Sequence, residues 1–365
     1  MSLLAVLVAF CGALLTSTQS TLNKCAGGYF AKNNICMENQ AGSYPSQTLA
    51  ITGQGNVQSR CAIAGAHDLN RIVYSIGSKI YVTDNSGITS SAQDSSPTSS
   101  FNSFWTSPDF TKMLAAPTNG PIYMSTNSGN TWTATSSLTT TTWHSVVATP
   151  DLTRIIASNK EPVAPSLFDS IDGGLNWRPV VSNFQQHIHT MAATSDLLSI
   201  IATVTQYTTP TKSLLYKSLN GGYSWQSIPN SGLQYWKGVA TSPCFTKYLA
   251  TAYDISSTTA TAGLIYKSVD AGVTWSVLSA SKSLSKNFCN IIADPSHTRI
   301  TVAMALLSGA TDEPFVQSVD SGNSFIFSGN LDGVNARNGG ATGLTACRAG
   351  SYSSAGAREC SLCAK

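Results

Sequence analysis

Charge is scarce in this chain of 365 residues, of which only 11% are Asp, Glu, Lys or Arg. The 21 basic and 18 acidic side chains are scattered, and no run of Lys or Arg could follow a phosphate backbone. We therefore expect no nucleic-acid partner. Asn-x-Ser/Thr sequons are absent as well, so any glycosylation would have to use the Ser- and Thr-rich loops.

Long apolar runs are missing after the first twenty residues. The run from Leu3 to Leu15 is shorter than the roughly 20 residues of a membrane helix, and small polar residues follow it. We predict a cleaved secretory signal over residues 1–20, and hence a secreted, extracellular protein without a membrane span after cleavage. An uncleaved membrane anchor is the alternative.

Amphipathic helix patterns and zinc-type spacings are also missing. The only close cysteine pair, "CSLC" at residues 360–363, stands alone, and we expect neither a metal nor another cofactor. His187 and His189 alternate in "QQHIHT" and would share one face of a strand, but no third metal ligand is identifiable.

The number of cysteines indicates whether the chain forms disulfides. Removing the signal removes Cys11 and leaves eight of the nine cysteines, an even number that indicates disulfides in a secreted chain. The simplest local pairs are Cys25–Cys36 and Cys347–Cys360.

One octapeptide occurs six times, at spacings of about 42 to 50 residues. Such a period is typical of propeller blades and other arrays. The copies are "TDNSGITS" from Thr83, "STNSGNTW" from Ser125, "SIDGGLNW" from Ser170, "SLNGGYSW" from Ser218, "SVDAGVTW" from Ser268 and "SVDSGNSF" from Ser318.

A second marker, two apolar stretches joined by a short turn, precedes each octapeptide, for example "VVATPDLTRIIAS". Each unit therefore predicts four short antiparallel strands, with the octapeptide as the turn between the third and the fourth. Six such units predict an all-β, six-bladed β-propeller over residues 59–330. Seven blades are the alternative, but the Gly-rich segment after residue 330 is a poor source of strands.

The octapeptide resembles the Asp-box, or bacterial neuraminidase repeat, Ser-x-Asp-x-Gly-x-Thr-Trp. Its third residue can bond backbone N–H groups further along the turn, its Gly can adopt positive φ, and its aromatic residue can pack between blades. We therefore assign it a structural role. Families with this box include sialidases, xyloglucan-active glycosidases, sortilin-type receptors and photosystem assembly factors, so the resemblance does not define a function. The third residues are Asn85, Asn127, Asp172, Asn220, Asp270 and Asp320.

The two ends of the chain form separate segments. Residues 331–365, with "CRAGSYSSAGARECSLC", resemble part of an ephrin-receptor-like cysteine-rich repeat, and residues 21–58 share its Cys-x-x-Gly-x-Tyr pattern. Neither segment is a complete module. One hypothesis is that they complete each other between neighbouring chains, which would give self-association through the termini.

Aligning the repeats places Cys61 and Cys289 at one position of the first strand, in blades 1 and 6. These blades are neighbours in a closed ring, so we predict a disulfide between them, provided that the Cα atoms approach within about 7 Å. Cys244 would then pair with Cys363, pair with another chain, or stay free.

The candidate ligand-binding residues lie at this position around the ring and at the one or two residues before it. Aromatic and hydrogen-bonding groups together suit the apolar face and polar rim of a sugar ring. The alternative for Trp143 and Trp236 is packing between blades, because Phe101 and Phe288 occupy the corresponding position in blades 2 and 6. The candidates are Asn102, Trp143, His144, His187, His189, Tyr235, Trp236 and Lys237.

We expect a non-enzymatic protein that binds extracellular glycan or protein, with no catalytic residues. The alternative is an Asp-box glycosidase acting on a polysaccharide. A sialidase is disfavoured, because Arg71, Arg154 and Arg299 are spread around the opposite rim and the Phe-Arg-Ile-Pro signature is absent. Inverting hydrolysis needs two facing carboxylates, and no spacing singles out a pair. The carboxylates expected in loops on the candidate side are Glu161, Asp254, Asp312 and Glu313.

Overall fold

The computed structural model divides into two compact units, residues 54–332 and residues 1–53 with 333–365. It describes residues 61–327 except 88, 94, 136–141, 160–165, 181–183, 185, 206–211, 254–262, 285 and 305–314. In the second unit it describes the backbone of four strands, which form two antiparallel pairs. These are β1 (Tyr29–Lys32) with β2 (Ile35–Glu38), and β27 (Ser351–Tyr352) with β28 (Ser361–Leu362).

Six four-stranded sheets make up the first unit, and in each the strands follow one another in chain order. Every pair is antiparallel, because short turns join sequential strands. Blade 1 holds β3 (Ile63–Gly65), β4 (Ile72–Ile76), β5 (Lys79–Thr83) and β6 (Ser91–Ala92); blade 2 holds β7 (Phe101–Thr106), β8 (Met113–Pro117), β9 (Tyr123–Ser125) and β10 (Thr133–Ala134); blade 3 holds β11 (Trp143–Ala148), β12 (Ile155–Asn159), β13 (Leu167–Ser170) and β14 (Arg178–Pro179).

The second half repeats this order. Blade 4 holds β15 (His187–Ala193), β16 (Ile200–Thr205), β17 (Leu215–Ser218) and β18 (Gln226–Ile228); blade 5 holds β19 (Tyr235–Thr241), β20 (Tyr248–Tyr253), β21 (Leu264–Ser268) and β22 (Ser276–Val277); blade 6 holds β23 (Phe288–Ala293), β24 (Ile300–Met304), β25 (Phe315–Ser318) and β26 (Ile326–Phe327). The short helix α2 (Ser279–Ser283) and a 3₁₀ turn at Pro229–Ser231 lie between blades. No helix in the described part of the chain is long and apolar enough to cross a membrane.

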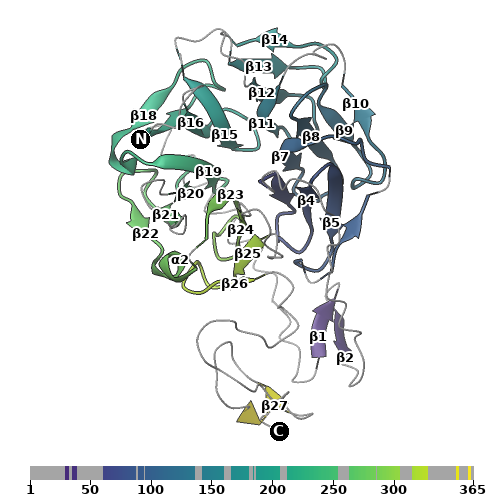
Figure 1. The fold of residues 1–365 in the computed structure, drawn as a ribbon, viewed down its shortest axis with the longest axis vertical. Helices are drawn as coiled ribbons and strands as arrows, with labels where there is room; N and C mark the ends of the chain where they lie inside the picture. Colours follow the sequence, from purple (N-terminus) through teal and green to yellow (C-terminus); the bar gives the residue numbers. More distant parts are fainter. Residues whose placement is uncertain are drawn as a thin grey trace, which may run out of the picture. The chain divides into compact units, whose positions relative to one another are not determined.

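The sheets follow one another around a ring (Figure 1). The first strand of every blade contacts the first strand of the next, and β23 of blade 6 contacts β3 of blade 1. The first strands therefore surround the axis, and the fourth strands form the rim. The predicted six-bladed β-propeller of four-stranded antiparallel blades is confirmed.

The turn between the first two strands has one conformation in all six blades. At its centre an apolar or aromatic residue, or one histidine, adopts a left-handed conformation with φ between 54° and 66°. This conformation costs about 1–2 kcal/mol outside glycine, so buried packing of the side chain must offset the strain. Each of these residues is buried; they are Leu69, Phe110, Leu152, Leu197, Phe245 and His297.

A basic residue follows this turn in five blades and reaches the next blade around the ring. The Arg71 guanidinium lies 4.5 Å from the Phe110 ring centroid, and Arg299 donates to Asn70 Oδ1 at 2.8 Å. The other three donate to backbone carbonyls of the following blade; they are Lys112, Arg154 and Lys247. Blade 4 has Ser199 at this position. The three arginines considered for a sialidase site are therefore contacts between blades.

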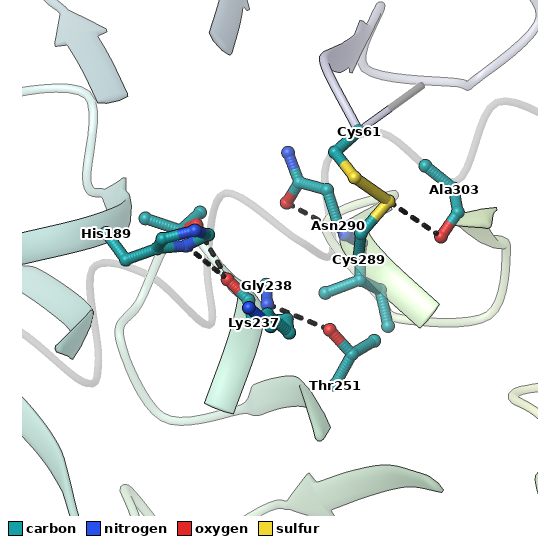
Figure 2. Close-up of a disulfide and its surroundings, with 10 residues drawn as sticks. Cys61, His189, Lys237, Gly238, Thr251, Cys289, Asn290 and Ala303 are labelled. Atoms are coloured by element: carbon teal, nitrogen blue, oxygen red, sulfur yellow. Dashed lines mark hydrogen bonds between the residues drawn. A yellow bond between two sulfur atoms is a disulfide. The ribbon is translucent and has the colours of Figure 1, made fainter. Parts of the chain in front are cut away.

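Ring closure also uses the predicted disulfide. Cys61 and Cys289 are bonded, and their Cα atoms lie 5.3 Å apart although 228 residues separate them in sequence (Figure 2). Cys244 takes part in a disulfide as well, so the free-thiol alternative for it is wrong. The pairs Cys25–Cys36 and Cys347–Cys360 stay predictions, because these side chains lie outside the described residues.

Candidate functional site

Five of the six first strands begin with a β-bulge. At each bulge the register with the second strand skips a residue, as between Trp143 and Ser145 or between Ile188 and Thr190. The position that the sequence alignment selects is therefore the bulge, where an unpaired residue is aimed differently from its neighbours. We call Asn102, His144, His189, Lys237 and the Cys61–Cys289 disulfide the bulge ring, and this side of the propeller the bulge end. The opposite side is the octapeptide end.

The residues flanking each bulge explain its shape. A large residue before the bulge is buried between sheets, as Trp143 and Phe288 are, and it fixes the start of the strand. A small polar residue after it bonds the next blade: Ser103 Oγ accepts a hydrogen bond from the Val146 N–H at 3.3 Å. Ser145 Oγ accepts in the same way from the Met191 N–H at 3.0 Å. The serines that follow these bulges therefore bond neighbouring blades together.

Three side chains converge on the backbone carbonyl of Lys237. Thr190 Oγ1 donates to this oxygen at 2.7 Å, and Thr203 Oγ1 lies 3.3 Å from it. His189 Nδ1 lies 3.3 Å from the same oxygen and 3.1 Å from Thr190 Oγ1 (Figure 2). Because a carbonyl only accepts, and the Thr190 hydrogen is directed to it, we place the imidazole proton on Nδ1. This tautomer makes Nε2 a hydrogen-bond acceptor.

Two further members of the bulge ring make close contacts. The His144 and His189 rings meet edge to face with centroids 5.1 Å apart, and both side chains are half-buried. The Asn102 amide donates to the carbonyl of Trp143 at 2.6 Å. Burial of the Lys237 side chain lowers the pKa of its ammonium, because desolvation disfavours the charged form. The ring thus offers an amide, two imidazoles and a partly desolvated ammonium.

The two tryptophans of the candidate set require a correction. Trp143 and Trp236 are only 1% and 3% exposed, so neither indole has a free face on which a sugar could stack. Trp143 packs against Phe168 and Trp177 of its own blade, and Trp236 packs against Tyr266 and Trp275. Each Nε1–H donates to a nearby glycine carbonyl. Their role is therefore packing.

His187 and Tyr235 lie at the first residues of β15 and β19, beyond the bulges, and are half-buried. Lys212 lies 5.7 Å from the Tyr235 ring centroid, which brings a loop cation to this aromatic residue. The bulge at His189 interrupts the alternation that would have given His187 and His189 one common face. No group of three potential metal ligands occurs among the described residues.

The sequence did not indicate the residues that hold the ring in place. Thr190 and Thr203 of blade 4 bond the Lys237 carbonyl of blade 5. Within blade 5, the Gly238 N–H donates to Thr251 Oγ1 at 2.8 Å (Figure 2). The available signal was the small or polar residue that follows each bulge. The carboxylates weighed for hydrolysis, Glu161, Asp254, Asp312 and Glu313, lie outside the described residues.

The octapeptide turns satisfy their own polar groups and leave little for chemistry. In blade 5, Ser268 Oγ accepts from the Gly272 N–H, and Asp270 Oδ1 accepts from the Thr274 N–H. The same bonds recur with asparagine, as in the Thr89 N–H to Asn85 Oδ1 bond. Hydrogen bonds from Asn176 and Ser170 lower the pKa of Asp172 below its usual value, which keeps it ionised and fixed in the turn.

These features define a β-propeller that is closed by a disulfide. Half-buried polar side chains of the bulge ring lie at one of its ends. Solved structures with a similar fold include a GH74 enzyme from Niastella koreensis, with 17% identity, TM-score 0.51, and coverage of 73% of this chain and 46% of that chain. The GH74 xyloglucanase from Xanthomonas campestris has 16% identity, TM-score 0.51, and coverage of 75% and 48%. A Bacteroides thetaiotaomicron protein of unknown function has 10% identity, TM-score 0.53, and coverage of 69% and 68%.

These similarities show a shared fold. This chain matches about half the length of the two GH74 proteins. No protein-family model matches the chain, and no curated protein does.

Proposed function

We propose that this chain is a secreted, non-enzymatic β-propeller that binds an extracellular ligand through its bulge end, and that the ligand is a glycan. The observation that carries the proposal is the bulge ring. Asn102, His144, His189 and Lys237 occupy one position in four successive blades, and each is half-buried rather than packed away. A half-buried set of donors and acceptors held by rigid strands is the arrangement that a binding site requires.

The composition of the ring favours binding over hydrolysis. A glycosidase needs two carboxylates that face each other across the sugar, and the bulge ring contains none. Its amide, imidazoles and ammonium can instead hydrogen-bond the hydroxyl groups of a saccharide without reacting with it.

Secretion is part of the same proposal. The apolar run from Leu3 to Leu15 supports a signal peptide, and the Cys61–Cys289 disulfide supports folding in an oxidising compartment. The six self-satisfied octapeptide turns support kinship with Asp-box propellers, in which the box is a structural element. Expression in a secreting host, followed by mass spectrometry of the N-terminus, tests the cleavage: a mature chain that still begins at Met1 contradicts it.

A polysaccharide panel, assayed for both binding and turnover, tests the function. We expect retention of the secreted chain on at least one immobilised polysaccharide, without release of reducing ends. The variant Asn102→Ala should weaken retention about tenfold, since a hydrogen bond to a ligand contributes about 1.5 kcal/mol. The exposed Ser227→Ala of β18 serves as the control and should bind normally. Turnover abolished by Glu161→Gln or Asp254→Asn would contradict the proposal, and so would the absence of binding to any polysaccharide.

A further inference from the structure

The structure describes the turns of the octapeptide end in all six blades, apart from residue 88. The second residue of the octapeptide is exposed in every blade. It is polar in blades 1 and 2, where it is Asp84 and Thr126, and apolar in the other four. An exposed turn residue gains nothing within its own chain from being apolar, so its recurrence in neighbouring blades indicates a surface that another molecule covers. The four residues are Ile171, Leu219, Val269 and Val319.

Blade 4 is the centre of this exposed apolar surface. Its turn between the first two strands exposes Leu198, where the other five blades have Asn or Thr. The Leu198 carbonyl accepts from the Gly221 N–H at 2.9 Å, which holds Leu198 beside the octapeptide residues Leu219 and Tyr223. The blades on either side expose two apolar residues each, Ile171 with Leu175 and Val269 with Val273. We call the exposed apolar side chains of blades 3, 4 and 5 the apolar arc; it is symmetric in number about blade 4.

The polar groups within the arc have partners in their own turns. Asp270 accepts from the N–H and the hydroxyl of Thr274. Asn220 accepts from the Ser224 N–H and donates to the Ser224 hydroxyl. Burying a polar group is costly chiefly when it loses its hydrogen bonds, and these side chains would keep theirs. A partner can therefore cover the turns without leaving these groups unsatisfied.

Opposite charges lie on the two sides of blade 4. At the octapeptide end, blade 3 has three aspartates and two arginines, whereas blade 5 has two lysines and one aspartate. Both arginines of blade 3 pair with the buried Asp169. None of the ion pairs of the described residues includes Asp151 or Asp172 of blade 3, or Lys247 or Lys267 of blade 5. Blade 3 is therefore negative and blade 5 positive, and blade 4 has one charge of each sign.

We propose that two copies of this chain pair through the octapeptide ends of blades 3, 4 and 5, about a two-fold axis that passes through blade 4. A two-fold interface requires a patch that is complementary to itself. With this axis, blade 4 lies on blade 4 of the other copy and the apolar arcs meet. The negative blade 3 of each copy faces the positive blade 5 of the other. This inference does not depend on the proposed function, because it concerns the opposite end of the propeller.

The size and composition of the surface suit such a pair. A standard interface uses about 20 to 30 residues on each partner, with an apolar centre and a polar rim. The octapeptides of blades 3, 4 and 5 alone supply 24 residues, as three segments of eight. A lipid surface suits the arc less well, because ionised carboxylates lie in the same turns. The Thr149 hydroxyl and other hydrogen bonds in its turn lower the pKa of Asp151 to about 2.

Sedimentation velocity of the full, disulfide-intact chain tests the pairing. We expect the mass of the sedimenting species to double between about 0.1 µM and about 100 µM, the range in which a mainly non-covalent, partly polar interface assembles. The dimer should separate into single chains in SDS without reductant, because the proposed contact contains no disulfide between copies.

A substitution in blade 4 tests the location. Leu219→Lys places like charges on both sides of the axis, where blade 4 meets itself, and should weaken the dimer at least about tenfold. The matched control is Thr126→Lys, which introduces the same residue at the same octapeptide position of blade 2 and should dimerise normally. Both side chains are exposed, so both variants should keep the unfolding midpoint of the parent chain.

Two further variants test the arrangement about the axis. Ile171→Lys adds a cation opposite the lysines of blade 5, and Val269→Glu adds a carboxylate opposite the aspartates of blade 3. Each variant alone should dimerise at least about tenfold more weakly than the parent chain. An equimolar mixture of the two should recover most of the parent affinity, because the new lysine of one chain then faces the new glutamate of the other.

Each contrary outcome overturns a stated part of the proposal. A chain that stays monomeric throughout overturns the pairing, and flotation of that monomer with phosphatidylcholine vesicles would assign the arc to a membrane instead. Undiminished dimerisation of Leu219→Lys overturns the location. Undiminished dimerisation of Ile171→Lys or Val269→Glu, or no recovery in their mixture, overturns the two-fold arrangement. A dimer that persists in SDS without reductant is joined through cysteines and overturns pairing through the arc.

Discussion

Cys61 of blade 1 and Cys289 of blade 6 lie at the same position of their blades, with Cα atoms 5.3 Å apart across the point where the ring closes. Each blade is complete without the other, since all four strands of each come from one continuous segment. The disulfide therefore fastens two finished blades. Hydrogen bonds from Arg299 to Asn70 and Ser86 hold the opposite end of the same junction.

Removing this disulfide should destabilise the ring without preventing its formation. The variant Cys61→Ala, Cys289→Ala opens a loop of 228 residues, for which loss of the cross-link costs about 3–5 kcal/mol. Thermal unfolding of the variant against the parent chain, both without reductant, measures the difference. Circular dichroism should remain that of a β protein, because the Arg299 contacts persist; equal midpoints for the two chains would contradict the role of the disulfide.

The junction of blades 5 and 6 depends on a glycine. A Cβ atom at Gly238 would lie 2.6 Å from the Asn290 Cα, which is backbone and cannot move aside alone. Gly238→Ala should therefore cost about 1–3 kcal/mol in the free energy of unfolding, measured in urea. The exposed Ser227→Ala is the control and should change the midpoint little. An unchanged midpoint for Gly238→Ala would show that blades 5 and 6 can move apart enough to accommodate the added methyl group without a loss of stability.

The octapeptide turns predict opposite outcomes for two similar substitutions. Asp270 Oδ2 accepts from the Thr274 hydroxyl, whereas Asn85 donates to the Thr89 hydroxyl, so a threonine at this position serves either partner. Asp270→Asn should thus leave the unfolding midpoint within about 1 °C. Asp172 instead accepts from the Asn176 amide, and Asp172→Asn would place two amide donors together and lower the midpoint by roughly 2 °C.

A second substitution tests whether the two facing amide donors cause this loss of stability. The double variant Asp172→Asn, Asn176→Thr recreates the combination found at Asn85 and Thr89 and should recover the parent midpoint. Binding to the polysaccharide should be unchanged in all of these variants, because the turns lie at the octapeptide end. Lost binding in a stably folded Asp270→Asn chain would be evidence of a functional role for the box.

His297 should make stability depend on pH. It occupies the buried, left-handed position that is Leu or Phe in the other five blades, and it is 1% exposed. Burial, together with the nearby Lys247 charge, lowers its pKa to about 4. Thr241 backbone lies close to the ring, but neither ring nitrogen reaches hydrogen-bonding geometry within the described residues. The neutral imidazole is therefore the form that packs.

The direction of this pH dependence follows from the difference between the pKa of His297 in the folded chain and its pKa in the unfolded chain. The unfolded histidine has a pKa near 6.5, so the unfolded chain takes up the proton first as pH falls. This contribution to stability is intact above pH 6.5 and falls by about 3 kcal/mol as pH approaches 4. Thermal unfolding between pH 4 and 8 should show this slope in the parent chain and a flatter profile in His297→Leu. Identical profiles would show that His297 binds its proton equally well in the folded and the unfolded chain, and would contradict the lowered pKa.

The repeated octapeptide and its spacing were sufficient to predict six blades, because each copy encodes a turn whose hydrogen bonds are local. The Cys61–Cys289 disulfide was predictable for a related reason. Once the repeat has a register, closure of the ring brings the same position of blades 1 and 6 together. The roles of Trp143 and Trp236 were not fixed by the sequence, since a tryptophan at a strand start suits both a core and a sugar-binding surface.

By itself, then, the sequence determined what depends on local turns and on period: the blades, their order and the position aligned around the axis. Only the tertiary structure decided which way that position faces. The bulges turn Asn102, His144, His189 and Lys237 out of the pleat, and hydroxyl groups of neighbouring strands hold the Lys237 carbonyl. It also brought the aspartates of the described residues to the octapeptide end, because side chains far apart in the sequence come to one end only when antiparallel strands stack their turns there.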